Sequence, residues 1–283
     1  MMLASPWARR NGCSGAPALG RLDFLLREPA EVYHAKSKEY LTSHALADFR
    51  ENPLLYRKRQ LGLVVEEDRP AFQIGRAAHT LILEGRDAYR RQYAFGGPTN
   101  PATGKLFDSR SKAYQEWAER QAKPVLTDRQ AALVEELAGA VQRHPVAGEL
   151  LAEGLPESVL RCDYRGVPCQ ARLDWLNPAK GLVDLKTCDH LKYLEADARS
   201  FGYLHQLAFY RALLALAGGE QVPVYLIAVE KREPFRCGVW RIDPNVLAAC
   251  ERDNEAALER LVRCRQLDHW PTGYEELRVF DHI

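Results

Sequence analysis

The spacing of apolar residues divides the chain into a helical first half and a second half that mixes strands and helices. In the first half, apolar side chains recur at helical spacing, and Thr42 or Ser43 and Thr127 or Asp128 are typical helix N-caps. Gly85 stands where a helix commonly ends. The pattern predicts helices at residues 41–60 with a break at Pro53, and at 73–84, 109–122 and 127–144.

The period of the pattern changes at Glu157, where strand-like runs separated by turn residues begin. A strongly apolar helix then ends at Gly218 and Gly219, two more strands follow, and Asp243 with Pro244 starts a last helix through about Gln266. The predicted strands cover residues 157–166, 167–181, 181–188, 222–231 and 235–243, with the helix at 201–219. This order indicates an α/β fold with a central mixed sheet flanked by helices and an N-terminal helical elaboration.

The composition is that of an ordinary globular chain: 283 residues, 46% hydrophobic and 27% charged. We expect residues 1–28, rich in Gly, Ala, Pro and Arg, to be a disordered leader, and residues 29–283 to form one domain with a helical part at 40–150 and a βββαββα core at 155–283. The chain has 39 Lys and Arg residues and 38 Asp and Glu residues, so it is not highly basic. This near-zero net charge still permits a local basic groove.

Two classes of protein are disfavoured by the sequence. No run approaches the roughly 20 apolar residues that span a bilayer, and the first residues contain no apolar export segment, so we expect a cytoplasmic protein without membrane partners. The seven cysteines are scattered and never form a CxxC pair. This spacing argues against a disulfide framework or a zinc knuckle.

The candidate chemistry lies in the run "VDLKTC", residues 183–188. Side chains alternate faces along a strand, so Asp184 and Lys186 emerge together while Val183 and Leu185 point the other way. Asp174, on the preceding predicted strand, can sit beside Asp184, and two carboxylates held close are costly unless a cation neutralises them. The pattern therefore predicts a divalent metal site, with Mg²⁺ as the ion that prefers a few carboxylates, waters and phosphate oxygens.

Asp174 followed by Asp184-Leu185-Lys186 resembles the signature of the PD-(D/E)XK nuclease superfamily. Three further segments resemble the branch that contains RecB-type nucleases and the exonuclease VIII (RecE-type) family. They are "GRAAH" at 75–79, like a G-x-x-x-H helix, "QLAFY" at 206–210, like a Q-x-x-x-Y motif, and "HWPTGY" at 269–274, like the segment that closes the exonuclease VIII nuclease domain. The resemblance runs from about residue 30 to the end in the family's order.

The resemblance implies a role for each matching position. His79, Asp174 and Asp184 would be metal ligands, with the backbone carbonyl of Leu185 as a fourth. The remaining matches would act on the substrate or support the site, and they are Lys186 as the catalytic lysine, Gln206 and Tyr210 as positioning residues, and Glu157 as the acidic residue that often opens the superfamily core.

The resemblance also implies an activity. It is that of a Mg²⁺-dependent exodeoxyribonuclease, with Mn²⁺ as a substitute, that digests linear duplex DNA from the 5′ end in phage-type recombination. The implied partners are DNA ends, further copies of the chain in a homo-oligomer, and a single-strand annealing protein. RecB-like relatives with an iron–sulfur cluster use one upstream and three clustered downstream cysteines, and Cys237, Cys250 and Cys264 are too widely spaced for that pattern. We therefore expect no cluster.

Other interpretations of the same residues stay open at this stage. A single histidine on an apolar helix is more often a core residue than a ligand, and Asp184 with Lys186 alone could be an exposed ion pair worth less than about 1 kcal/mol. The metal chemistry would also suit a structure-specific or single-strand DNA nuclease on the same fold. A nucleic-acid-binding recombination subunit without activity is a further alternative, which a broken ligand set would favour.

Overall fold

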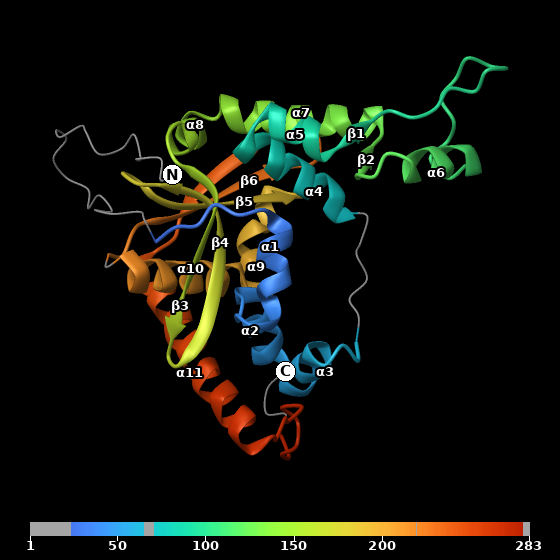
Figure 1. Cartoon of the computed structure of the whole chain (residues 1–283). Helices are drawn as coiled ribbons and strands as arrows, with labels where there is room; N and C mark the ends of the chain where they lie inside the picture. The colour runs from blue at the N-terminus through green and yellow to red at the C-terminus, as the bar shows by residue number, and fades with distance from the viewer. Residues whose placement is uncertain (1–23, 65–70, 219, 280–283) are drawn as a thin grey trace, which may run out of the picture.

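A computed structural model describes residues 24–64, 71–218 and 220–279, and its centre is a five-stranded mixed sheet (Figure 1). The strand order is β3-β4-β5-β6-β7, with β5 and β6 parallel and the other neighbours antiparallel. The strands are β3 (Leu155–Tyr164), β4 (Val167–Asn177), β5 (Gly181–Cys188), β6 (Val224–Glu230) and β7 (Cys237–Arg241). The predicted mixed α/β fold is confirmed.

Helices cover both faces of the sheet. The first layer packs over β4 to β7 (Figure 1). It consists of α4 (Ala71–His79), the π-helical turn η3 (Thr80–Glu84), α5 (Arg86–Gln92), α7 (Asp128–Arg143) and α8 (Pro145–Leu151). The opposite layer is centred on the long helix α10, which packs against β3 and β4. It consists of α2 (Ser43–Glu51), α9 (Leu194–Ser200), α10 (Tyr203–Gly218) and α11 (Pro244–Leu267).

Smaller elements lie around these two layers. The helical ones are α1 (Ala30–Ala35), the 3-10 turn η2 (Lys36–Lys38), α3 (Pro53–Gln60), α6 (Lys112–Glu119) and the 3-10 turn η4 (Leu191–Tyr193). Two short strands, β1 (Ala94–Phe95) and β2 (Val125–Leu126), pair in parallel. None of the helices in the described ranges is long and apolar enough to cross a membrane.

Local capping chemistry explains where the predicted helices begin. Thr42 caps α2 by accepting a hydrogen bond from the backbone N–H of Ala45 at 3.2 Å. Asn52 caps α3 in the same way, and Pro53 occupies its first turn, where no N–H is needed. Thr127 forms a reciprocal capping box at the start of α7, and Asp243 caps α11. Thr42 and Thr127, of the two alternatives at each position, are thus the N-caps.

Several sequence-based expectations need correction. The helix predicted at 73–84 begins at Ala71 and becomes π-helical at Thr80 before Gly85 ends it with a φ of 88°. The short elements α1, α5, α8, α9, β1 and β2 were not predicted. Leu26 bridges to Val159 of β3, so the ordered chain starts before the predicted boundary at residue 29. Residues 1–23 of the expected leader, and Gly219, lie outside the described residues.

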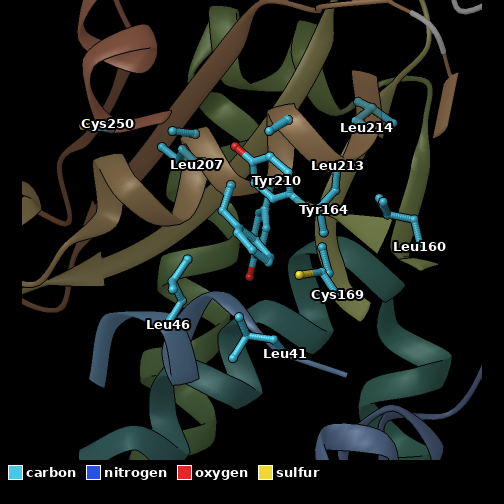
Figure 2. Packing of buried hydrophobic residues seen from close by; sticks show 14 of the residues in the cluster. Leu41, Leu46, Leu160, Tyr164, Cys169, Leu207, Tyr210, Leu213, Leu214 and Cys250 are labelled. Atoms are coloured by element: carbon cyan, nitrogen blue, oxygen red, sulfur yellow. The ribbon is translucent and has the colours of Figure 1, made fainter. Parts of the chain in front are cut away.

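Each face of the sheet supports its own buried cluster. Leu182 packs on the α10 side, whereas Val183 and Leu185 pack on the α4 and α7 side, as the alternation along β5 predicts. Figure 2 shows part of the buried cluster on the α10 side, in which Tyr210 of α10 lies among aliphatic side chains such as Leu207. The two clusters hold β5 from both sides and fix the direction in which its polar residues point.

A buried carboxylate at the end of β6, that of Glu230, connects this strand to the turn after β5. Glu230, which is 2% exposed, accepts hydrogen bonds from Arg236 Nε at 2.8 Å and from the Leu191 backbone N–H at 2.8 Å. The hydrogen bonds from Arg236 lower the pKa of Glu230 to about 2 despite its burial. The carboxylate therefore ties β6 to the turn that follows β5.

We expect Glu230→Gln to lower the free energy of unfolding at neutral pH by about 1–3 kcal/mol. Because the folded-state pKa is depressed, the contribution is complete above the unfolded-state pKa of about 4.3 and is lost as the pH falls through about 2. Urea unfolding of both proteins at several pH values measures this difference, with exposed Glu220→Gln as the control. A difference that stays constant down to the acid limit would contradict the assignment.

Candidate metal and catalytic site

The candidate site lies where β4 separates from β5. The two strands pair only from Trp175 and Val183 to the turn, and Asp174 is the first residue of β4 beyond this ladder. Its Oδ2 accepts a hydrogen bond from the backbone N–H of Leu185 at 2.8 Å. A carboxylate thus replaces the strand partner that Leu185 lacks on this side, and it is held at the fork between the strands.

Helix α4 brings His79 to the same fork. An added Cβ on Gly75 would lie 3.3 Å from the Thr187 hydroxyl, so the absence of a side chain there lets α4 pass close over β5. His79 follows one turn later on the same face of α4. Its Nδ1 lies 3.6 Å from Asp174 Oδ2. In "GRAAH", Gly75 therefore lets α4 lie close to β5, and His79 is brought within reach of Asp174 as a result.

Glu157 approaches from β3. Pro156 pairs with Trp175 and Ser158 with Leu173, so Glu157 lies across from Asp174 without entering the ladder. Its φ of 51° is left-handed, which is rare for a residue that is not glycine. One ligand atom from each of His79, Glu157 and Asp174 lies within 4.8 Å of the others. The strand departs from regular geometry at the residue that completes this cluster.

The charge on Glu157 is strongly opposed by its surroundings. Burial raises the pKa of Glu157 to about 8, and repulsion from Asp174 adds to the effect. Arg172 offsets part of it, because its Nε lies 2.9 Å from Glu157 Oε2. A divalent cation between Glu157 and Asp174 would remove this repulsion.

Asp184 and Lys186 form a buried ion pair beside the cluster. Asp184 is 1% exposed, and Lys186 Nζ lies 2.7 Å from its Oδ2. Burial raises the pKa of Asp184, against the attraction of Lys186. Burial also opposes the charge on Lys186, but attraction to Asp184 and Asp174 outweighs it and raises the lysine pKa. Lys186 therefore keeps its proton in this pair.

These residues fit a divalent metal ion. Apart from Lys186, no donor in the described part of the chain pairs with the two buried oxygens of Asp184. Imidazole and carboxylate groups are suitable ligands, and His79, Glu157 and Asp174 already converge. Asp184 lies outside that convergent set, although it is close enough to Asp174 for each charge to affect the other. Leu185 contributes its backbone N–H to Asp174.

Helix α10 supplies the surroundings of Lys186. Gln206 Nε2 donates to the Tyr210 hydroxyl at 2.8 Å, and Ser43 Oγ lies 3.5 Å from the same hydroxyl. The Tyr203 ring, which the sequence interpretation missed, faces Lys186 with Nζ 5.1 Å from the ring centroid. Tyr203 precedes Gln206 by three residues and Tyr210 by seven, so the helical spacing of the matched motif could have identified it.

We expect the isosteric change Asp174→Asn to weaken Mn²⁺ binding by at least about tenfold, or 1.4 kcal/mol. The asparagine oxygen can still accept from the Leu185 N–H, so the fork keeps its shape while one negative charge is lost. Titration calorimetry measures the affinity, and Asp87→Asn on exposed α5 is the matched control. Unchanged Mn²⁺ affinity in Asp174→Asn would mean that the cluster does not bind metal.

Comparison with known proteins agrees with this fold. No curated protein matches the sequence. A crystal structure of a candidate exonuclease from Eubacterium rectale covers 91% of this chain and 96% of its own, with 15% identity and a TM-score of 0.65. The structure of LHK-Exo in complex with dAMP covers 85% of this chain and 98% of its own at 15% identity, but its TM-score of 0.29 supports no argument.

A family model described as a PDDEXK-like domain of unknown function (DUF3799) matches residues 43–282. This range contains every residue that the sequence assigned to the site, from His79 to Tyr210. The predicted membership of the PD-(D/E)XK superfamily is thereby confirmed. The chain belongs to the PDDEXK-like family DUF3799.

Proposed function

We propose that this chain is a Mg²⁺-dependent exodeoxyribonuclease that hydrolyses phosphodiester bonds from the 5′ ends of linear duplex DNA. The observation that carries the proposal is the Asp184–Lys186 pair, 2.7 Å apart, beside the convergent His79, Glu157 and Asp174. Acids, an imidazole and a lysine at one strand fork suit metal-assisted hydrolysis of a phosphodiester.

The chain's own residues divide the work of this reaction. His79, Asp174 and Asp184, with Glu157 and the Leu185 carbonyl as additional oxygen donors, would hold the metal. A bound divalent ion polarises the phosphate and lowers the pKa of a coordinated water. Lys186 would donate a hydrogen bond from its ammonium group to the attacking water or to a phosphate oxygen. The Tyr203 ring limits where the ammonium group can lie.

The finer parts of the proposal come from the family resemblance. They are the preference for duplex ends, a homo-oligomer that encloses the DNA, and the transfer of the single-stranded product to an annealing protein in phage-type recombination. The candidate exonuclease from Eubacterium rectale shares this fold, but endonucleases can share it as well, so the choice of an exonuclease rests on the family resemblance.

The proposal is tested with linear duplexes labelled at the 5′ or 3′ end and with covalently closed circles, each with Mg²⁺, Mn²⁺ or EDTA. We expect early release of the 5′ label from linear duplex, a slower loss of the 3′ label, no reaction on circles and none with EDTA. Cleavage of circles would favour a structure-specific or single-strand nuclease. DNA binding without any cleavage would favour an inactive recombination subunit.

A second experiment isolates the role of Lys186. We expect Lys186→Ala to lower the single-turnover rate at saturating Mg²⁺ by at least about a hundredfold, because the charge that develops on the phosphate loses a donor. Arginine should not restore the rate, since its planar guanidinium cannot place a compact ammonium beside Asp184. An alanine variant that recovers full rate when Mg²⁺ is raised would show that Lys186 only adjusts metal occupancy.

A further inference from the structure

A cavity of about 500 Å³ lies among the C-terminal end of α2, the start of α10 and the middle of α11. Its charged lining consists of Arg50, His205, Asp253, Glu259, Arg260 and Arg263. A second hollow of about 270 Å³ shares its three arginines and continues toward Phe49 and Pro271. We name the surface formed by Arg50, Arg260 and Arg263 the arginine trough.

The positive charge of Arg50 is held in place without a carboxylate on its guanidinium. Arg50 Nη1 donates to the Oδ1 of buried Asn254, and Asn254 Nδ2 donates in turn to the backbone carbonyl of His205 at 2.9 Å. Burial lowers the pKa of Arg50, attraction to Cys250 and Asp253 opposes this effect, and repulsion from Arg260 adds to it. An amide fixes the position of a guanidinium but does not neutralise it, so the trough is ready for an anion.

The other two arginines leave their charge available as well. Arg260 and Arg263 are exposed on α11, and no acidic side chain of the described residues forms an ion pair with either. Asp253 lies 3.2 Å from His205 through Oδ2 and Nε2, and Glu259 is the other acid of the larger cavity. The repulsion between Arg50 and Arg260 costs free energy that a bound anion recovers.

Two neighbouring residues, Gly202 and Tyr203, connect the trough with the candidate site. An added Cβ on Gly202 would lie 3.5 Å from Arg50 Nη2, so the Arg50 side chain reaches the turn between α9 and α10. Tyr203, the next residue, places its ring over Lys186. Phe201, on the other side of Gly202, is 67% exposed and its ring lies 5.9 Å from that of Tyr203. One turn of chain therefore joins the lysine to the first arginine.

We propose that the arginine trough binds the sugar–phosphate backbone of the DNA strand beyond the bond that is cleaved. This inference rests on the proposed function and adds the direction in which the substrate extends. A phosphodiester chain offers evenly spaced anions to several arginines, and guanidinium groups match phosphate oxygens in pairs. The exposed Phe201 ring lies against Tyr203, next to the Gly202 turn, and offers a face on which a base can stack.

The test uses the full chain with Arg260→Ala/Arg263→Ala, two exposed positions whose loss leaves the buried core intact. Fluorescence anisotropy with labelled duplex DNA in EDTA measures affinity without cleavage at several salt concentrations. We expect affinity to fall about tenfold or more and the slope of log affinity against log salt to decrease by about 2, one for each lost phosphate contact. The matched control is Arg120→Ala/Arg129→Ala, which removes equal charge near α6 and on α7.

The outcomes separate this inference from the proposed function. A wild-type salt slope in the Arg260→Ala/Arg263→Ala protein would overturn the trough as a DNA site, even if the chain proves to be a nuclease. A smaller salt slope in the double variant, together with a wild-type protein that binds DNA but never cleaves it, would uphold the trough and refute the nuclease. The assignment would also be overturned if Arg120→Ala/Arg129→Ala reduced DNA affinity and salt slope by the same amounts. It would be overturned likewise if Arg260→Ala/Arg263→Ala weakened binding of polyglutamate as much as binding of DNA, because either result would show only general attraction between charges. In a nuclease, KM should rise while kcat stays the same.

Discussion

Glu157 and Asp174 converge where β4 separates from β5, and Asp184 lies beside them. The mutual repulsion of these three acidic side chains is the constraint on which the site depends. Carboxylates in a partly buried position favour protonation unless cations oppose them. Lys186 compensates Asp184 and Arg172 compensates Glu157, each through one close contact. Two monovalent partners for three acids leave charge that a divalent cation is suited to neutralise.

The irregular backbone features near the site serve this arrangement. The ladder between β4 and β5 stops at Trp175, Glu157 adopts a left-handed conformation, and α4 becomes π-helical directly after His79. Each departure sacrifices regular hydrogen bonding or conformational freedom. A regular sheet would have paired the backbone at Asp174 and Glu157. Three irregular backbone features in one place are typical of a functional site, where geometry matters more than local stability.

Part of this arrangement could be predicted from local periodicity and capping signals, whereas His79, Glu157, Gln206 and Tyr210 were identified through the family resemblance. Alternation along β5 placed Asp184 and Lys186 on one side, and capping residues located α2 and α7. The π-helical turn, the left-handed Glu157 and the contact of Tyr203 with Lys186 arise from packing between distant elements, which periodicity does not encode. Short helices such as α9 carry too few residues to give a helical pattern of their own.

Formal net charge says little about what this chain can bind, because +1 is the sum of separated groups of opposite sign. Acids gather at the strand fork, where they repel a phosphate unless metal is present. Arg50, Arg260 and Arg263 stand beyond the Gly202 turn without an ion-pair partner among the described residues. A polyanion would therefore be held first by the arginines, and its approach to the acids would depend on the metal. Under the two proposals, attraction and cleavage belong to different surfaces, so that binding without metal need not lead to reaction.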